Sequence, residues 1–337
     1  MHNNATVQLE VTNLCKYYKA GKKKVLKAVD DISFVIYKGE TLGIVGESGC
    51  GKSVTCMSIL QLNPARRTRY PSGQILFDGK DLLHMTPKQL RPIRGNEIAM
   101  VFQEPMTAMN PLFPIGDQLM EALRVHNPRM EKSEAYERSL EAVRRVKIPN
   151  PERILKTYPF ALSGGMRQRA MIAMAMITRP KLLICDEPTT ALDVTIQAQV
   201  LDLMNELKHE IGTSIIFITH DLGVISEMAD RVLIMYGGRV CEEADVDELF
   251  TKPRHPYTVG LIDSHPNPEY DGDRLKVIPG SVPTLRDMPA GCPFNNRCAY
   301  ASDTCRDVFP DFEEAESGHT VACHNWRQAL QKGGAAR

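Results

Sequence analysis

The sequence predicts an α/β fold in which helices cover the faces of a mainly parallel β-sheet. Two observations support this prediction. Strand-like apolar runs alternate with helical stretches along most of the 337 residues, and this alternation is typical of parallel sheets. The apolar run at residues 42–45 also leads through a glycine-rich turn into a helix over residues 54–62, which is the order of a strand–turn–helix unit.

The composition of each segment predicts its element. Three early segments have the alternating or β-rich composition of strands: residues 7–14, 25–36 and 73–77. Three later segments have it again: residues 181–185, 214–218 and 231–235. Helices are expected over residues 115–126, 132–146 and 194–210. Because residues 104–178 are mainly helical and lie between two strands, we expect them to form an inserted helical subdomain.

The composition changes after about residue 252. Prolines recur from Pro253 to Pro293, regular periodicity fades and four cysteines appear. We therefore expect a first domain at residues 1–251, with the helical subdomain inserted at about 104–178. Residues 252–337, called the C-terminal extension below, are expected to form a small irregular Cys-rich module.

Charge and hydropathy exclude several classes of protein. The 41 basic and 41 acidic residues cancel and the pI is about 7.1, which argues against a nucleic-acid partner. No apolar run approaches the roughly 20 residues that cross a bilayer. The first residues lack the charged and apolar regions of a secretion signal. We expect a reducing compartment, which disfavours structural disulfides among the nine cysteines.

The turn at residues 46–53, called the phosphate loop below, fits the pattern G-x-x-x-x-G-K-[ST]. Its residues are Gly46, Glu47, Ser48, Gly49, Cys50, Gly51, Lys52 and Ser53. Glycines let backbone N–H groups point at a polyanion, and the helix N-terminus adds the positive end of its dipole. Lys52 would reach the β- and γ-phosphates and Ser53 would hold Mg²⁺. The pattern in this context predicts a nucleotide site rather than a glycine-rich surface turn.

Two acids end the strand predicted at residues 181–185. Asp186 and Glu187 follow an apolar run directly, at the strand end where a neighbouring phosphate loop would need a carboxylate. We assign Asp186 to Mg²⁺, and Glu187 to polarising the water that attacks the γ-phosphate. Beside a phosphate loop, this assignment is preferred to two surface acids that cap a strand.

A second glycine-rich turn, residues 162–165 and called the signature turn below, opens a helix. Its polar and glycine residues are Ser163, Gly164 and Gly165. A helix N-terminus of this kind can face an anion, although Ser163 can also be a simple N-cap. Because the chain already has one phosphate loop, we expect this turn to serve the nucleotide of another subunit.

Over residues 7–250 these motifs together resemble the ATP-binding cassette (ABC) ATPases, in which the LSGG turn is the family signature. The resemblance assigns four further residues. Gln103 resembles the Q-loop glutamine that senses Mg²⁺ and the γ-phosphate, and Asp193 lies in a D-loop. His220 resembles the switch histidine, and Tyr18 resembles the aromatic that stacks on adenine, with Tyr17 as the alternate. In place of the glutamine that many members have after LSGG, this chain has Met166.

The resemblance implies a fold and a mechanism. The fold is a P-loop NTPase core with a mainly parallel sheet, an N-terminal antiparallel β subdomain and an inserted helical subdomain. Mg²⁺ would be held by Ser53, Gln103 and Asp186. Two cassettes would close head to tail on two ATP molecules, each touching Lys52 of one chain and Ser163 of the other. Loss of the γ-phosphate by hydrolysis would open the dimer.

Two local stretches narrow the resemblance. Residues 103–111 resemble the extended Q-loop of importers for dipeptides, oligopeptides and, in relatives, nickel, and residues 253–258 resemble the start of their shared C-terminal extension. The implied partners are a second, different ATPase chain, two integral membrane permease subunits and, indirectly, an extracytoplasmic solute-binding protein. The implied location is the cytoplasmic face of the cell membrane, as a peripheral subunit.

Other functions stay open at this point. An ATPase for nickel or another small solute is the nearest alternative. A soluble ABC ATPase of DNA repair would need a long coiled coil, and one of translation usually carries two cassettes; the chain shows neither. A sensor module that has lost catalysis would not need Glu187 and His220.

The four cysteines of the C-terminal extension, Cys292, Cys298, Cys305 and Cys323, suggest a metal site. Thiolates suit both Zn²⁺ and iron–sulfur clusters. The spacing resembles the cysteine set of dipeptide-importer ATPases that holds a [4Fe-4S] cluster, with Zn²⁺ or free thiols as alternatives. We also expect Cys50 to have a lowered thiol pKa, because it lies beside Lys52 and a helix N-terminus, and therefore to be open to alkylation.

Overall fold

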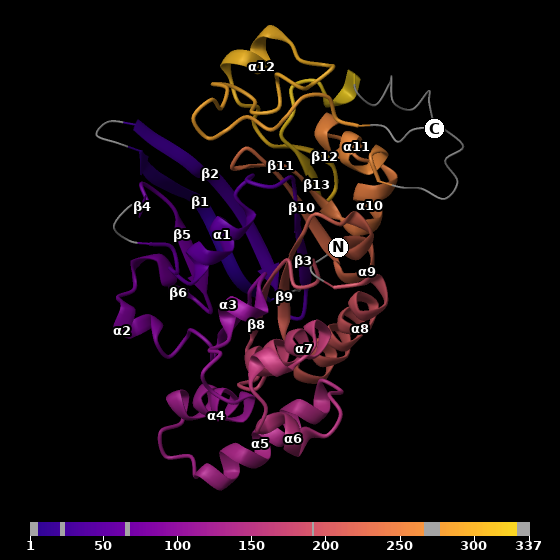
Figure 1. Ribbon diagram of the computed structural model, residues 1–337. Helices are drawn as coiled ribbons and strands as arrows, with labels where there is room; N and C mark the ends of the chain where they lie inside the picture. The colour runs from indigo at the N-terminus through magenta and orange to yellow at the C-terminus, as the bar shows by residue number, and fades with distance from the viewer. Residues whose placement is uncertain (1–5, 21–23, 65–67, 191, 266–276, 329–337) are drawn as a thin grey trace.

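The computed structural model describes residues 6–20, 24–64, 68–190, 192–265 and 277–328. Within these residues the chain forms two sheets, a block of helices at one end and the C-terminal extension at the other (Figure 1). No helix in the described part of the chain is both long enough and apolar enough to span a membrane.

The N-terminal sheet is antiparallel. Its central strand β1 (Val7–Ala20) pairs along its whole length with β2 (Lys24–Tyr37), and on its other edge with β4 (Thr68–Arg69) and β5 (Gln74–Phe77). Strand β6 (Lys80–Asp81) completes the sheet beside β5. The predicted N-terminal antiparallel β subdomain is therefore confirmed.

The second sheet has the strand order β12-β13-β11-β10-β3-β9-β8-β7. The bounds are β3 (Thr41–Val45), β7 (Ile98–Val101), β8 (Leu182–Asp186), β9 (Ser214–Thr219), β10 (Arg231–Tyr236), β11 (Arg239–Asp245), β12 (Glu313–Glu316) and β13 (His319–Val321). The five strands from β10 to β7 are parallel, and β11, β13 and β12 add an antiparallel edge. The predicted mainly parallel sheet is confirmed.

The helices fall into three groups. Those of the core are η2 (Leu82–His84), α1 (Lys52–Ile59), α2 (Pro87–Leu90), α7 (Gly164–Met176), α8 (Val194–Ile211), α9 (Leu222–Met228) and α10 (Val246–Thr251). The inserted block contains α3 (Pro105–Ala108), α4 (Ile115–His126), α5 (Lys132–Arg145), α6 (Pro151–Leu155) and η3 (Pro159–Ala161). The C-terminal extension contributes α11 (Pro256–Asp263) and α12 (Asp303–Asp307).

The central sheet separates two hydrophobic cores, because successive side chains of a strand point to opposite faces. On β9, Ile216 and Ile218 pack towards the N-terminal sheet and α1, while Ile215 and Phe217 pack towards α7 and α8. Strands buried on both faces read as continuous apolar runs, and β8, β9 and β10 have this composition.

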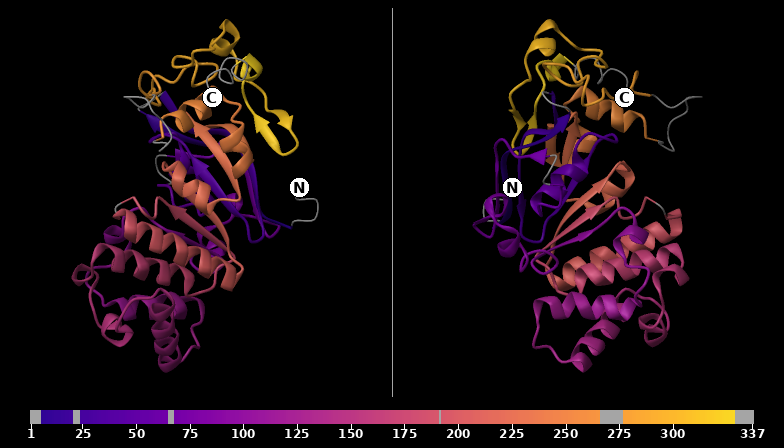
Figure 2. Two further views of the ribbon diagram at one scale, coloured as in Figure 1. Left: turned by 90° about the vertical axis from the view of Figure 1, so that its right-hand side faces the viewer. Right: turned by 60° about the vertical axis from the view of Figure 1, so that its left-hand side comes forward.

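The views in Figure 2 agree with Figure 1 on where the helical block lies. Helices α4 to α6 form one end of the molecule, and the C-terminal extension forms the opposite end, beyond the upper edges of both sheets. The helical block and the C-terminal extension therefore contribute to different surfaces of the molecule.

The C-terminal extension packs directly against the central sheet and its hydrophobic core. The hairpin β12–β13 pairs with β11, and Phe294 and Cys305 belong to the same hydrophobic cluster as the helix-covered face of the central sheet. A buried polar cluster supports this junction: the Glu242 carboxylate accepts hydrogen bonds from the backbone of Arg254 and His255, and contacts His319 Nε2 at 2.7 Å.

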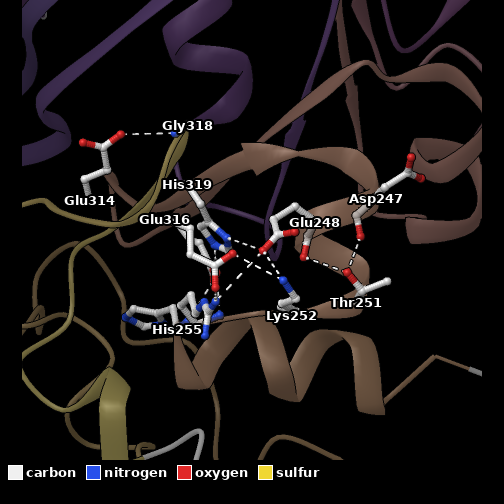
Figure 3. Close-up of polar contacts among 11 residues, drawn as sticks. Asp247, Glu248, Thr251, Lys252, His255, Glu314, Glu316, Gly318 and His319 are labelled. Carbon is white, nitrogen blue, oxygen red and sulfur yellow. Dashed lines mark hydrogen bonds and ion pairs between the residues drawn. The ribbon is translucent and has the colours of Figure 1, made fainter. Parts of the chain in front are cut away.

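Figure 3 shows polar contacts at the same junction. His319 of β13, Glu248 of α10 and Glu316 of β12 converge near Lys252 and His255. Lys252 Nζ lies 3.3 Å from a Glu316 carboxylate oxygen. Ion pairs from α10 and from the loop before α11 thus reach the hairpin and join the extension to the edge of the sheet. The position of the domain boundary at residue 251 stays a prediction.

Candidate functional site

The phosphate loop connects β3 to α1 and is packed tightly against the core. Gly51 has φ +106, and a Cβ there would lie 2.6 Å from the Ala28 carbonyl oxygen, so the position requires glycine. Lys52 is 5% exposed, and its Nζ donates to the carbonyls of Gly46 at 2.6 Å and Glu47 at 3.2 Å. The lysine is therefore held inside the loop that it closes.

A pocket of about 430 Å³ lies over this loop. Residues 48–54 line it together with Tyr18, Gln103, Glu187 and Leu285. The structure thus brings together residues from the N-terminal sheet, the loop after β7, the end of β8 and the C-terminal extension. Ala28 also lines the pocket, and sequence reasoning placed all of these residues at the site except Ala28, Val54 and Leu285.

Asp186 ends β8 and meets Ser53 at the start of α1. Its Oδ1 accepts a hydrogen bond from Ser53 Oγ at 2.9 Å, and the residue is 7% exposed. Burial raises the pKa of the Asp186 carboxyl above its ordinary value. A hydroxyl and a desolvated carboxylate at this distance are oxygen ligands that suit Mg²⁺.

Glu187 lies at the centre of a polar group above Asp186. Its Oε2 accepts from Gln103 Nε2 at 2.9 Å and from Thr190 Oγ1 at 3.0 Å, and its Oε1 lies 3.5 Å from His220 Nδ1. The carboxylate is mainly buried, while His220 is exposed. The three residues predicted from separate motifs, Gln103, Glu187 and His220, are therefore in contact around one carboxylate.

The two adjacent tyrosines have different surroundings. Tyr18 lines the pocket, and its hydroxyl donates to Asn63 Oδ1 at 3.3 Å. The hydroxyl of Tyr17 donates to the Asp30 carboxylate, away from the residues that line the pocket. This geometry favours Tyr18 over Tyr17 as the residue that stacks on a base.

The signature turn is exposed and lies outside this pocket. Ser163 Oγ accepts from Met166 N at 3.3 Å, as the N-cap interpretation predicts, and Ser163 and Gly164 are both exposed. A Cβ on Gly164 would meet no atom of the chain within 4 Å. At Gly165 a Cβ would lie 2.7 Å from a side-chain atom of Ile196, so this glycine is needed for close packing against α8.

Asp193 precedes α8 and is its N-cap. Its Oδ1 accepts from Ile196 N at 3.0 Å, and the residue is exposed. The first residue of the predicted D-loop, Ala191, lies outside the described residues. The D-loop and the signature turn are thus adjacent, because Ile196 contacts both.

The prediction of a reactive Cys50 is wrong. The residue is 1% exposed, because it belongs to the buried cluster between the two sheets and its Sγ lies against Gly46. Burial raises the pKa of the Cys50 thiol, and this effect exceeds the lowering by Lys52. The local sequence showed the lysine and the helix N-terminus, but it did not show the burial.

The four cysteines of the C-terminal extension line one small pocket, with His255, Phe294 and Asn325 among its other walls. All nine cysteines of the chain are free thiols. Burial raises the pKa of the Cys292 thiol to about 11 and that of the Cys323 thiol to about 12. In the residues that the structure describes, no group of three or more His, Cys, Asp or Glu side chains is arranged to hold a metal ion.

Three residues of the C-terminal extension that contact the phosphate loop or line the pocket were also missed from the sequence. Tyr257 Oη accepts from the backbone N–H of Glu47 at 2.8 Å. Arg297 forms an ion pair with the Glu47 carboxylate, and Leu285 lines the pocket wall. Each lies more than 200 residues from the phosphate loop, so no local pattern could have indicated the contact.

Comparison with known families gives two matches along the chain. A model described as "ABC transporter" matches residues 29–190. A second model, "Oligopeptide/dipeptide transporter, C-terminal region", matches residues 241–305. The first range contains the phosphate loop, the signature turn and Glu187, and the second contains three of the four cysteines of the extension.

Individual proteins match over almost their full length. The oligopeptide transport ATP-binding protein AppD of Bacillus subtilis is 51% identical, over 94% of this chain and 95% of its own. The dipeptide transport ATP-binding protein DppD of the same organism is 49% identical, over 90% of each chain. Among solved structures, a dimeric post-hydrolysis state of the ATP-binding cassette MJ0796 with ADP and Pi aligns with a TM-score of 0.64 and 27% identity, covering 71% of this chain and 98% of that one.

Proposed function

This chain belongs to the ABC transporter ATPases, and within them to the oligopeptide/dipeptide transporter group, and from this premise we propose that it hydrolyses ATP to drive peptide import. The observation that carries the proposal is the arrangement at one pocket. Lys52, the Ser53–Asp186 pair and the Gln103–Glu187–His220 group come from different elements and meet there. This is the set of functions that phosphoryl transfer to water requires.

Each residue has a distinct role in the proposed reaction. The amides of the phosphate loop and Lys52 bind the β- and γ-phosphates, and Tyr18 stacks on the adenine. Ser53, Gln103 and Asp186 would hold Mg²⁺, which supplies charge neutralisation between the β- and γ-phosphates. Glu187 orients and polarises the attacking water, and His220 contacts the γ-phosphate.

The signature turn is proposed to act on a second nucleotide. Ser163, Gly164 and Gly165 present a helix N-terminus to solvent, and Asp193 lies beside them on the same exposed surface. Two chains placed head to tail would bring this surface over the phosphate loop of the partner. The likeness to a dimeric cassette with ADP and Pi supports this arrangement.

The partners follow from membership of the importer group. As an importer subunit the chain is a peripheral protein of the membrane, bound to permease subunits and served by a solute-binding protein. We propose that the partner ATPase is a second, different chain. The names of the relatives favour peptides over nickel as the solute, since they are described as oligopeptide and dipeptide transport proteins.

We also propose that Cys292, Cys298, Cys305 and Cys323 hold a [4Fe-4S] cluster. Four thiols around one pocket have the chemistry of such a site, although their present arrangement does not form a ligand group for a metal ion. When bound, the cluster would supply a covalent cross-link between segments that are irregular on their own. Zn²⁺ is the alternative occupant.

Reconstitution tests the transport proposal. The chain is purified with its permeases, its partner ATPase and its solute-binding protein in liposomes, and labelled dipeptide, oligopeptide and Ni²⁺ are offered in turn. Peptide uptake that requires ATP, and that is lost in Lys52→Ala, supports the proposal. Uptake of Ni²⁺ without peptide uptake would contradict it.

Metal analysis after anaerobic purification tests the cluster separately. Iron and acid-labile sulfide in equal amounts, with a brown colour that is lost in Cys298→Ser, support it. A colourless protein with one equivalent of zinc would refute it. Cys241→Ser is the matched control, because Cys241 is buried, its carbonyl accepts from the N–H of Ala322 next to Cys323, and it is not one of the four proposed ligands.

A further inference from the structure

The C-terminal extension contacts the phosphate loop through a bidentate ion pair. Arg297 Nη1 lies 2.7 Å from Glu47 Oε2, and Nη2 lies 3.2 Å from Oε1. The Arg297 side chain is 5% exposed and that of Glu47 is 29% exposed. Two parallel hydrogen bonds between a guanidinium and a carboxylate fix orientation as well as charge.

Glu47 is the anchor of the phosphate loop, and each of its three polar groups is already engaged. Its backbone N–H donates to Tyr257 Oη at 2.8 Å, so this amide does not point at a phosphate. Its carbonyl accepts from Lys52 Nζ at 3.2 Å. Its carboxylate is held by Arg297. Two of these three partners, Tyr257 and Arg297, come from the C-terminal extension.

Arg297 is itself fixed before it reaches Glu47. Its Nε donates to the Pro279 carbonyl at 2.9 Å, and its Nη1 donates to Tyr236 Oη at 3.2 Å. Its guanidinium also lies 5.8 Å from the centre of the Tyr236 ring and 5.9 Å from that of Phe294. A guanidinium held in this way meets the carboxylate without further loss of side-chain freedom.

The charge of Glu47 explains why the loop needs this partner. A carboxylate in a loop that binds a triphosphate would repel the ligand, and repulsion between like charges is stronger in a partly buried site than in water. A paired guanidinium cancels that charge. Leu285 lies in the wall of the same pocket, so the extension contributes to the nucleotide site at two separate points.

We propose that Arg297 is a positioning residue of the ATP site: it neutralises Glu47 and, with Tyr257, holds the phosphate loop in the shape that accepts a nucleoside triphosphate. The proposal rests on the proposed function, because it assumes that the pocket binds ATP. It adds that the C-terminal extension is part of the nucleotide site and that its integrity sets the affinity for ATP.

The test is calorimetric titration of the full-length chain with the magnesium complex of a non-hydrolysable ATP analogue. Arg297→Met keeps the aliphatic stem and removes the charge. We expect its Kd for the analogue to rise about tenfold or more, since it leaves a partly buried carboxylate unpaired beside the phosphates. In the assembled ATPase, KM for ATP should rise with kcat changed much less, because Arg297 touches no reacting atom.

The double variant Arg297→Met/Glu47→Gln separates charge neutralisation from a merely structural role. If Arg297 acts by cancelling the charge of Glu47, removing that charge restores the affinity to within about threefold of Glu47→Gln alone. A merely structural arginine would not be rescued by the loss of a second charged group. Rescue also shows that the weak binding of Arg297→Met does not come from misfolding.

Arg306→Met is the matched control, because Arg306 lies in the same extension but pairs with Asp303 at the exposed surface. It should bind the analogue like the wild type. Wild-type affinity in Arg297→Met, or a double variant as weak as Arg297→Met, would overturn the proposal. A wild-type chain that binds no nucleotide would instead contradict the proposed function itself.

Discussion

The phosphate loop and the signature turn are both glycine-rich turns at helix N-termini, yet the chain treats them in opposite ways. The phosphate loop is packed under the N-terminal sheet and surrounded by Tyr18, Gln103, Glu187 and Leu285. The signature turn presents Ser163 and Gly164 to solvent, and neither lines the pocket over the phosphate loop. One anion site is therefore enclosed by its own chain, whereas the other is open.

This difference indicates where the missing contacts must come from. A glycine is needed at Gly51 and at Gly165 because neighbouring atoms of the same chain pack there, but Gly164 has open space around it. Because the chain itself leaves space for a Cβ at Gly164, any need for glycine at this position comes from a molecule outside the chain. The predictions below test this contrast, from the largest expected effect to the smallest.

Glu187→Gln should abolish ATP hydrolysis at the pocket over the phosphate loop and leave ATP binding intact. The amide cannot polarise water, and loss of a general base typically slows a reaction by about 10²–10⁴-fold. Phosphate release by the assembled ATPase measures the first effect and calorimetry the second. Glu227→Gln, an exposed acid on α9, is the control. Hydrolysis at the wild-type rate in Glu187→Gln would remove Glu187 from the mechanism.

Gly164→Ala tests the open side. The added methyl group meets nothing within the chain, and alanine favours a helix by about 1 kcal/mol over glycine, so the isolated chain should fold and bind ATP normally. In the assembled ATPase, the methyl group would crowd the partner's nucleotide, and we expect at least about a tenfold loss of turnover. Full turnover would mean that no ligand approaches this turn.

His255→Asn tests how the C-terminal extension supports the phosphate loop, because His255 binds the backbone of Tyr257 and Tyr257 contacts Glu47. His255 Nδ1 accepts from Tyr257 N at 3.0 Å and caps α11, which requires a neutral ring. Burial lowers the His255 pKa to about 4, although the charge of Glu242 opposes this shift. The native state therefore excludes a proton that the unfolded chain accepts, so stability is complete above about pH 6.5 and declines as the pH falls towards 4.

Urea unfolding between pH 7 and pH 4.5 measures this dependence, and the His255 contribution is on the order of 1–3 kcal/mol. In His255→Asn that part of the decline should disappear, while exposed His209→Asn should leave it unchanged. An unaltered pH profile in His255→Asn would show that the ring is not held neutral by the fold. The signature turn, capped by Ser163 alone, has no such dependence.

Asp186→Asn is expected to have the smallest effect on stability. It should stabilise the nucleotide-free chain while it abolishes function. Burial raises the Asp186 pKa, so the protonated carboxyl contributes stability at low pH, and that contribution is lost as the pH rises through the native-state value and the buried carboxyl ionises. At pH 7 the neutral amide should raise the Tm of the nucleotide-free chain by a few degrees. Mg²⁺-dependent hydrolysis should be lost. A lower Tm would contradict the assigned cause.

The helices and strands whose positions depend on local sequence were predicted well. The helix expected over residues 115–126 is α4, and the strand expected over residues 214–218 is one residue longer, because apolar periodicity reports burial directly. Strand β1 extends to Ala20, well beyond the predicted end at residue 14, because Tyr17 and Tyr18 pair with β2 and β4. Pairing with a distant strand leaves no periodic signal.

The contacts that the sequence could not predict join distant segments. Arg297 and Glu47 are 250 residues apart, and their pairing requires the fold to be known. The burial of Cys50 also depends on residues far along the chain, such as Met235 and Val240 of the same buried cluster. The four cysteines were found together because residue type alone marks them, but the shape of their pocket was not predictable.

The central claim is that one copy of this chain contains only half of each hydrolytic centre, and turnover by a chain held monomeric tests it most directly. The isolated chain, shown to be monomeric by light scattering, is compared with the assembled ATPase at saturating ATP. We predict that the monomer binds ATP but hydrolyses it at less than about a hundredth of the assembled rate. A monomer that turns over ATP at the assembled rate, with Gly164→Ala as active as the wild type, would contradict the account.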